Sequence, residues 1–208
     1  MELKAWHFIG KDRQLGYGHG ETVEPGYIYS VQGDLELCGW GMHASVRAID
    51  ALRYAPGPVV CRVKMGGDII KDNDKVVAHT REVMWMTDAT NCLHEFACVV
   101  AEDALRRAGV KDPCCWAAIA AKRKWVKGEI GDAELDAARA AARAAALDAT
   151  WDATRAATRA ATRVTWAAVW DAARAAAWVA ARVAALDAAW AEQNKILSEM
   201  LEKLERET

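Results

Sequence analysis

The side chains with the most reactive chemistry in this sequence are six cysteines and five histidines. The cysteines are Cys38, Cys61, Cys92, Cys98, Cys114 and Cys115. No two of them have the Cys-x-x-Cys spacing that is typical of zinc and redox sites. Cys92 and Cys98, with His94 between them, would point to different faces of a helix. We therefore expect no metal site and no disulfide framework, and we interpret the thiols as small apolar residues.

The segment GMHAS, residues 41–45, places an imidazole two residues before a hydroxyl. His43 is a candidate binding residue, although a histidine in such a turn more often has a structural, hydrogen-bonded role. Ser45 precedes an expected helix and could cap it. The spacing of the residues does not assemble a nucleophile, a base and an orienting acid. The sequence thus favours binding over catalysis.

A second set of candidates lies in an alanine-rich stretch, WDATRAATRAATRVTWAAVWDAARAAAW, residues 151–178. Arginine charge and tryptophan stacking can together hold a nucleotide or a single-stranded nucleic acid. The residues in question are Arg155, Arg159, Arg163, Trp166 and Trp170. Interleaved aspartates oppose an anionic ligand, so a nucleotide-binding sponge is an alternative and nucleic acid is not favoured.

The element that would carry these residues is a long helix. All fourteen glycines and all four prolines lie at or before Gly131, and most of the alanine follows it. Alanine has the highest helix propensity, and Asp132 and Glu134 suit a helix start. The large side chains recur every four residues, so they wind around the helix and do not mark a single face.

The tryptophans of this helix need a partner surface, because exposed rings over such a length would promote aggregation. Without glycine or proline to form a tight turn, self-association is favoured over a folded-back hairpin. The end of the chain has an apolar spacing typical of a short coiled coil, at Ile196, Leu197, Met200, Leu201 and Leu204. The sequence predicts a homo-oligomer formed through 131–208, as a coiled coil or helical bundle.

The preceding part of the chain predicts an α+β head, residues 1–110, with a mixed sheet and helices on one face. Four segments have the composition of strands: 3–9, 26–31, 59–65 and 75–86. Three segments begin and end like helices: 45–57, 88–109 and 112–128. Asp88 and Asp112 are the expected caps of the last two, and Gly109 and Gly128 their expected ends. Residues 111–130 would form a helical connector.

Several of these motifs together resemble a family. The string KAWHF, the segment LELCGWGMHASVRAIDALRYAPGPVVCRVKMGGDII, then DKVVAHTREVMW and an Ala/Arg/Trp-rich end resemble an uncharacterised family of bacteriophage and prophage proteins. The resemblance implies a viral accessory protein in a bacterial cytoplasm. Accessory proteins of this kind often block host defence, so an anti-defence role is the expectation.

The stretch GWGMHASVRAIDALRYAPGPVVCRVKM is also similar to the strand, Ser/Thr, helix and strand pattern of ADP-ribosyltransferase-like domains. This resemblance implies NAD as the cofactor, with Ser45 and Tyr54 lining the nicotinamide pocket. Glu95 would orient the acceptor or stabilise the oxocarbenium-like transition state. His7 is the candidate for the basic residue of the first strand.

The net charge and the distribution of apolar residues indicate in which compartment the protein acts. The formal net charge of −2 gives no overall attraction to nucleic acid or anionic membrane. The first residues lack an apolar leader, and no apolar run approaches the length of a membrane span, so we expect a cytoplasmic protein. Our reading is an oligomeric interaction protein without a cofactor, whose head binds a host protein or a small anionic ligand. The alternatives are the NAD-dependent transferase and the nucleotide sponge.

Overall fold

The computed structural model describes residues 2–15, 20–145 and 168–208, with only the backbone described at 168–187. The chain forms two compact units. The head unit consists of Met1–Leu93 together with Trp190–Thr208, and the helical unit of His94–Ala189. The head unit therefore contains the C-terminal end of the chain as well as the N-terminal sheet.

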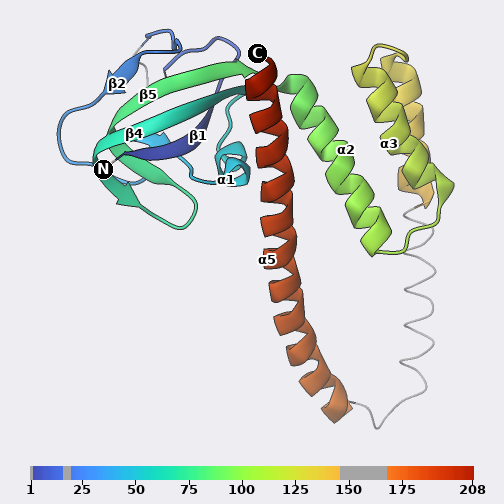
Figure 1. The fold of residues 1–208 in the computed structure, drawn as a ribbon. Helices are drawn as coiled ribbons and strands as arrows, with labels where there is room; N and C mark the ends of the chain where they lie inside the picture. The colour runs from blue at the N-terminus through green and yellow to red at the C-terminus, as the bar shows by residue number, and fades with distance from the viewer. Residues whose placement is uncertain (1, 16–19, 146–167) are drawn as a thin grey trace. The chain divides into compact units, whose positions relative to one another are not determined.

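The head unit is built on a five-stranded sheet, which makes the fold α+β as expected. Its strands are β1 (Leu3–Ile9), β2 (Ile28–Ser30), β3 (Met42–Ala44), β4 (Val59–Lys71) and β5 (Val76–Asp88). The order is β1-β4-β5-β2, and β3 also pairs with β5. Figure 1 shows β4 and β5 as a long hairpin with β1 beside β4.

The strand pairings correct one expectation. Every pairing among the named strands is antiparallel, so the predicted mixed sheet was wrong. The reason is the short turn between β4 and β5, because a parallel neighbour would need a long crossover connection. The four predicted strands are confirmed. β3, within the GMHAS segment, was not predicted, because a strand of three residues is too short to show a clear alternation.

The sheet closes on itself through one backbone bridge. Trp6 of β1 donates its N–H to the Ser45 carbonyl at 2.7 Å and accepts from the Ser45 N–H at 2.9 Å. Because β1 pairs with β4, β4 with β5, and β5 with β3, this bridge after β3 completes a ring of strands. A bulge between Gly66 and Ile69 lets β4 bend enough to follow the ring.

The side chains of β1 alternate between the inside of this ring and its outer face. Ala5 and Ile9 belong to the inner core, together with residues of β4 such as Cys61. Trp6 and Phe8 are also buried, at 2% and 1% exposure, on the opposite face of the strand. The strand is therefore covered on both sides, and α1 (Ala48–Arg53) contacts it.

Helix α1 is not capped as the sequence suggested. The expected Ser45 cap was wrong, because Ser45 is taken up by the bridge to Trp6 and the helix begins after Arg47. Its first turn is completed by α5 (Ala168–Glu207), whose Asn194 Oδ1 accepts the Ile49 N–H at 3.2 Å. The indole N–H of Trp190 donates to the buried Asp50 carboxylate at 3.3 Å. The end of α5 thus fastens α1 within the head unit.

The apolar row near the chain's end also packs inside the head unit. Leu197 and Leu201 are both 0% exposed, and the Trp85 indole N–H donates to Thr208 Oγ1 at 3.0 Å. The sequence suggested that this row forms a seam between chains. In the structure, two of its leucines belong to the core of their own chain.

Helices α2 (Thr90–Arg107) and α3 (Pro113–Val126), which lie wholly or mostly in the helical unit, confirm the predicted helix boundaries. They end near Gly109 and Gly128, both with a positive φ. Asp112 caps α3 by accepting the Cys114 N–H at 2.8 Å. Asp88 accepts the Thr90 N–H at 2.8 Å at the start of α2.

The alanine-rich region contributes a helix over 132–145 and the first part of α5. At the start of the helix over 132–145, Glu134 accepts the Gly131 N–H at 2.7 Å. Asp136 and Arg139 form an ion pair at 3.3 Å, with the i, i+3 spacing that makes residues neighbours on a helix. The expectation of one continuous helix extends over 146–167, which lie outside the described residues.

The burial of the α5 leucines gives a first prediction. Leu201→Ala should lower the free energy of unfolding by about 2 to 5 kcal/mol, because it leaves a cavity in a closed core. Urea unfolding followed by circular dichroism measures the change, and Glu202→Ala on the exposed side of the helix is the matched control. A Leu201→Ala protein that loses only an assembled state and keeps the stability of its head would contradict this packing.

Candidate functional site

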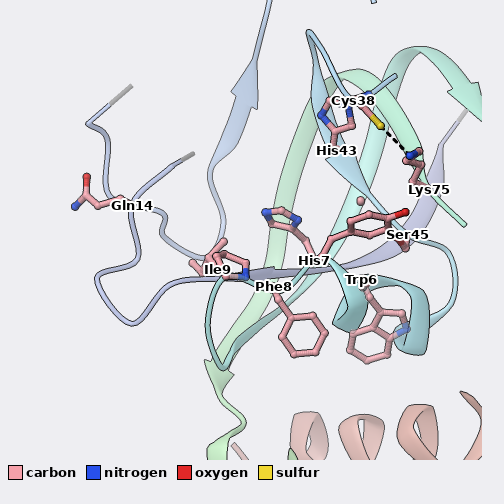
Figure 2. Close-up of a pocket in the computed structure, with 13 residues that line it drawn as sticks. Trp6, His7, Phe8, Ile9, Gln14, Cys38, His43, Ser45 and Lys75 are labelled. Carbon is pink, nitrogen blue, oxygen red and sulfur yellow. Dashed lines mark hydrogen bonds between the residues drawn. The ribbon is translucent and has the colours of Figure 1, made fainter. Parts of the chain in front are cut away.

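A cavity of about 490 Å³ lies in the head unit where β1, β3 and α1 meet. This volume is in the range of small-molecule sites. Its apolar walls include Ile9, Ala44, Ala51 and Pro56. The polar side chains around it include His7, Cys38, His43, Ser45, Tyr54 and Lys75. Figure 2 shows five of them, His7, Cys38, His43, Ser45 and Lys75, around one space, with Gln14 set apart.

His7 supplies a neutral imidazole to the cavity. The alternation of β1 places it between Ala5 and Ile9 on the inner side, opposite Cys61 of β4. In Figure 2, its ring lies in the cavity while Phe8 and Trp6 point away. Burial, and then the charge of Arg81, hold the pKa of His7 well below its usual value. Within the described part of the chain, the ring makes no hydrogen bond, so it offers one donor and one acceptor.

His43 has no free ring nitrogen. Its Nε2 accepts the Cys38 N–H at 3.1 Å, and its Nδ1 donates to the Gly41 carbonyl at 3.0 Å. The backbone partners fix this neutral tautomer, because an N–H can only donate and a carbonyl can only accept. Burial lowers the pKa of His43 in the same sense. His43 therefore holds a turn at the cavity wall, which matches the structural role considered from sequence.

The loop before β3 is shaped by tight backbone packing. Gly41 has a φ of +134°, and a Cβ at this position would lie 2.2 Å from a methyl group of Val77. Cys38 adopts a left-handed conformation with a φ of 64°, which few residues other than glycine adopt. This geometry brings the exposed Cys38 thiol to the cavity, where Lys75 Nζ lies 2.8 Å from its sulfur.

The mouth of the cavity carries a chain of hydrogen bonds. The Tyr54 hydroxyl donates to Asp74 Oδ2 at 2.6 Å, and Arg53 pairs with the same oxygen at 3.4 Å. The hydrogen bond raises the pKa of Tyr54 and lowers that of Asp74. Lys75 Nζ also lies 5.4 Å from the Tyr54 ring centroid. The tyrosine is thus a neutral donor, and the aspartate is already paired.

A buried arginine lies in the core beside these groups. Arg81 of β5 is 4% exposed and stands in register with Tyr29 of β2 and Met65 of β4. Its Nη1 donates to the His43 carbonyl at 3.0 Å, and its Nε has no hydrogen-bond partner among the described residues. Burial lowers the pKa of Arg81 to about 10, so the guanidinium is still charged at neutral pH.

The structure brings together some of the predicted site residues and separates others. Ser45, Tyr54 and His43 line the cavity with His7. Glu95 belongs to α2 in the helical unit, where its carboxylate pairs with Arg123 at 2.8 Å. Arg155, Arg159, Arg163 and Trp166 lie outside the described residues. Trp170 falls in α5, where only the backbone is described.

Sequence reasoning missed Lys75 and Arg81 altogether. The available signal was weak, because Arg81 lies in a polar stretch, residues 79–82, between the two apolar halves of the strand segment VVAHTREVMWM. In a half-buried strand, a charged residue is expected on the exposed face, unless a bulge changes which face each residue occupies. The bulged pairing of β4 with β5 makes such a change possible, and it is not visible in the sequence.

The cysteines form no shared site in the described structure. All six are free thiols, and no group of three or more potential metal ligands occurs among the described residues. Cys61 and Cys98 are buried, and burial raises the pKa of Cys61 to about 12. Cys38 differs from them because it is exposed and paired with a lysine.

The part of the chain that forms the cavity is similar to a known protein domain. Residues 4–95 match a domain of unknown function, DUF7666. The matched range contains every residue that lines the cavity. No curated protein and no solved structure matches the chain. In the described ranges, no helix is both long enough and apolar enough to cross a lipid bilayer.

The depressed pKa of His7 gives a second prediction. Its ordinary value is 6.5, so below that pH the unfolded chain binds a proton that the folded chain refuses. The free energy of unfolding should therefore fall as the pH drops below about 6.5. His7→Gln should remove part of this decline, by up to about 1.4 kcal/mol per pH unit.

Urea unfolding at several pH values, with an NMR titration of the histidine rings, measures both effects. His43 and His94 also have lowered pKa values, so the part of the decline in unfolding free energy that they cause should persist in His7→Gln. A His7 ring that titrates near its ordinary value would contradict the enclosed position.

Proposed function

We propose that the protein is a binding protein whose head unit takes a small organic molecule in this cavity. The observation that carries the proposal is the His7 ring. It is neutral, lies among apolar walls and, among the described residues, has an unused donor and an unused acceptor. Ligand sites commonly combine apolar walls with a few such polar groups that fix orientation.

The composition of the cavity supports binding more than catalysis. Among the described residues that line it, none is a carboxylate. His43, the other imidazole, uses both ring nitrogens to hold the loop. General acid and base chemistry needs groups that can exchange protons near neutral pH, and His7 is held neutral. The site thus orients a ligand better than it transforms one.

One observation favours an ADP-ribosyltransferase-like enzyme as the second candidate. His7, Ser45 and Tyr54 come from β1, the end of β3 and the end of α1, and all three line one cavity. A nicotinamide ring is planar and has an amide that could pair with such groups. This candidate enzyme lacks its expected carboxylate at the cavity, because Glu95 belongs to the helical unit and pairs there with Arg123.

The sequence resemblance supports a setting for this binding. We place the protein among phage-encoded accessory proteins that act in the cytoplasm of a bacterial host. A head that takes up a small molecule could remove a signal on which host defence depends. A host protein bound by the head is the other partner expected from the sequence.

Association through the alanine-rich region would bring several head units into one assembly. Repeated binding units gain avidity without new contacts. Because Leu197 and Leu201 pack within their own chain, the proposed association depends on the earlier part of the region, 131–189.

The third prediction tests ligand uptake. Full-length protein incubated with a bacterial small-molecule extract should retain a low-mass compound, detected by native mass spectrometry. Ala51→Leu, which narrows the cavity from α1, should abolish retention, whereas Ala55→Leu, which does not line it, should not. His7→Phe keeps a planar aromatic ring but removes both polar nitrogens, and it should weaken retention.

The outcomes separate the candidates. Retention that neither cavity variant affects would overturn the cavity as the site, and a retained nucleotide in that case would favour the row Arg155, Arg159 and Arg163. Transfer of label from NAD to a host component, lost in Ser45→Ala, would favour the enzyme. We expect no such transfer, and we expect Glu95→Ala to leave ligand retention unchanged.

The fourth prediction concerns assembly. Light scattering on the full-length chain should give a mass larger than that of a monomer. Trp166→Ala with Trp170→Ala should reduce it, while circular dichroism shows that the head stays folded. A chain that remains monomeric at high micromolar concentration would remove the oligomer from the proposal.

A further inference from the structure

We infer that the cavity selects ligands that carry an anionic group, a carboxylate or a phosphate. The inference rests on the proposed function and names the chemical class of the ligand. It comes from the charges that surround the cavity in the described residues, and from the carboxylates that are already engaged elsewhere.

The first observation is the unbalanced charge of Arg81. A guanidinium that is 4% exposed would normally pair with a carboxylate, because an isolated buried charge is costly. Among the described residues, Arg81 has no such ion pair. It donates to the His43 carbonyl, and its Nε is unpartnered. Because His43 is part of the cavity wall, this positive charge acts on the space beside it.

The second observation is Lys75 at the cavity itself. Its ammonium group is the charged group that lines the cavity among the described residues, and its neighbour at 2.8 Å is the Cys38 sulfur. A thiol is a weak hydrogen-bond acceptor, so this contact can be exchanged for a stronger one. A carboxylate or phosphate oxygen would be that stronger partner, because it forms a charge-assisted hydrogen bond.

The third observation is that nearby carboxylates are already neutralised. Asp74 accepts from Tyr54 and pairs with Arg53. Asp50 of α1 pairs with Arg47 at 2.5 Å and accepts from Trp190. Asp74 also acts electrostatically on Lys75, but neither carboxylate lines the cavity, and neither pairs with Arg81 among the described residues. The cavity therefore has an excess of positive charge, and a bound anion would compensate it.

The other polar groups fit this polarity. Neutral His7 can donate one N–H to the anion, and the Ser45 hydroxyl has no side-chain hydrogen bond among the described residues. Apolar walls at Ala51 and Pro56 suit the body of an organic molecule. An acid with an aromatic or aliphatic body satisfies both parts of the cavity, which inorganic phosphate alone would not.

The test compares three probes that share one ring system: naphthalene-2-carboxylate, 2-naphthyl phosphate and naphthalene-2-carboxamide. Affinities for the full-length protein are measured by NMR titration of the His7 ring and the Ser45 amide at low and high salt. We expect at least one anion to bind about tenfold more tightly than the amide at low salt, with a smaller ratio at high salt. Preference between the two anions identifies carboxylate or phosphate.

Two lysine variants sharpen the comparison. Lys75→Gln should weaken anion binding about tenfold and leave the amide unchanged. Lys4→Gln makes the same charge change on an exposed residue of β1 that does not line the cavity, and it should alter neither. Arg81→Gln should also reduce the preference for anions. Should that variant fail to fold, Lys75→Gln decides by itself.

Each outcome bears on one conclusion. Equal affinity for the anions and the amide, or an anion preference that persists in Lys75→Gln, would overturn the inference while leaving a ligand cavity in place. If none of the three probes moves the His7 or Ser45 signals, the anion inference fails. The proposed function is then decided separately, by retention of a compound from the extract.

Discussion

The pair of backbone hydrogen bonds between Trp6 and Ser45 determines the architecture of the head unit. Without this bridge, β1 would be an edge strand and β3 a short appendage of β5. With it, the strands close into a ring that has an inside. The bridge also fixes the chemistry of the cavity, because it brings His7 of β1 and Ser45 after β3 into one wall. A closed ring removes the exposed edge and allows polar groups to be buried in a small domain.

Burial then sets the protonation state of each group inside the ring. The same desolvation that keeps His7 and His43 neutral makes the charge of Arg81 costly, because no carboxylate pairs with it among the described residues. The resulting interior contains donors and positive charge, but no acid among the described lining residues. The proposed binding function rests on this combination of groups. Proton transfer would require at least one group that titrates near neutral pH.

The C-terminal end of α5 supports the wall of the cavity that α1 forms, through hydrogen bonds to α1. Helix α1 is only six residues long and has no side-chain cap of its own. Trp190 and Asn194 supply the missing hydrogen bonds to Asp50 and Ile49, and the Trp190 ring lies 5.8 Å from the Arg53 guanidinium. Because Ala51 and Tyr54 line the cavity, the stability of the cavity depends on residues far along the chain.

The sequence alone determined the local elements, because their signals are local. The strands at 3–9, 59–65 and 75–86 follow from β-branched runs, and α3 from the Asp112 cap, Pro113 and Gly128. The tertiary structure decided which residues meet. Ser45 looked like a helix cap and became part of a bridge, and Leu197 and Leu201 looked like an oligomer seam and became core. The buried position of Arg81 depends on the bulged pairing of β4 with β5, which the sequence does not reveal. Spacing along a chain reports periodicity, whereas strand closure and burial depend on partners tens to more than a hundred residues away.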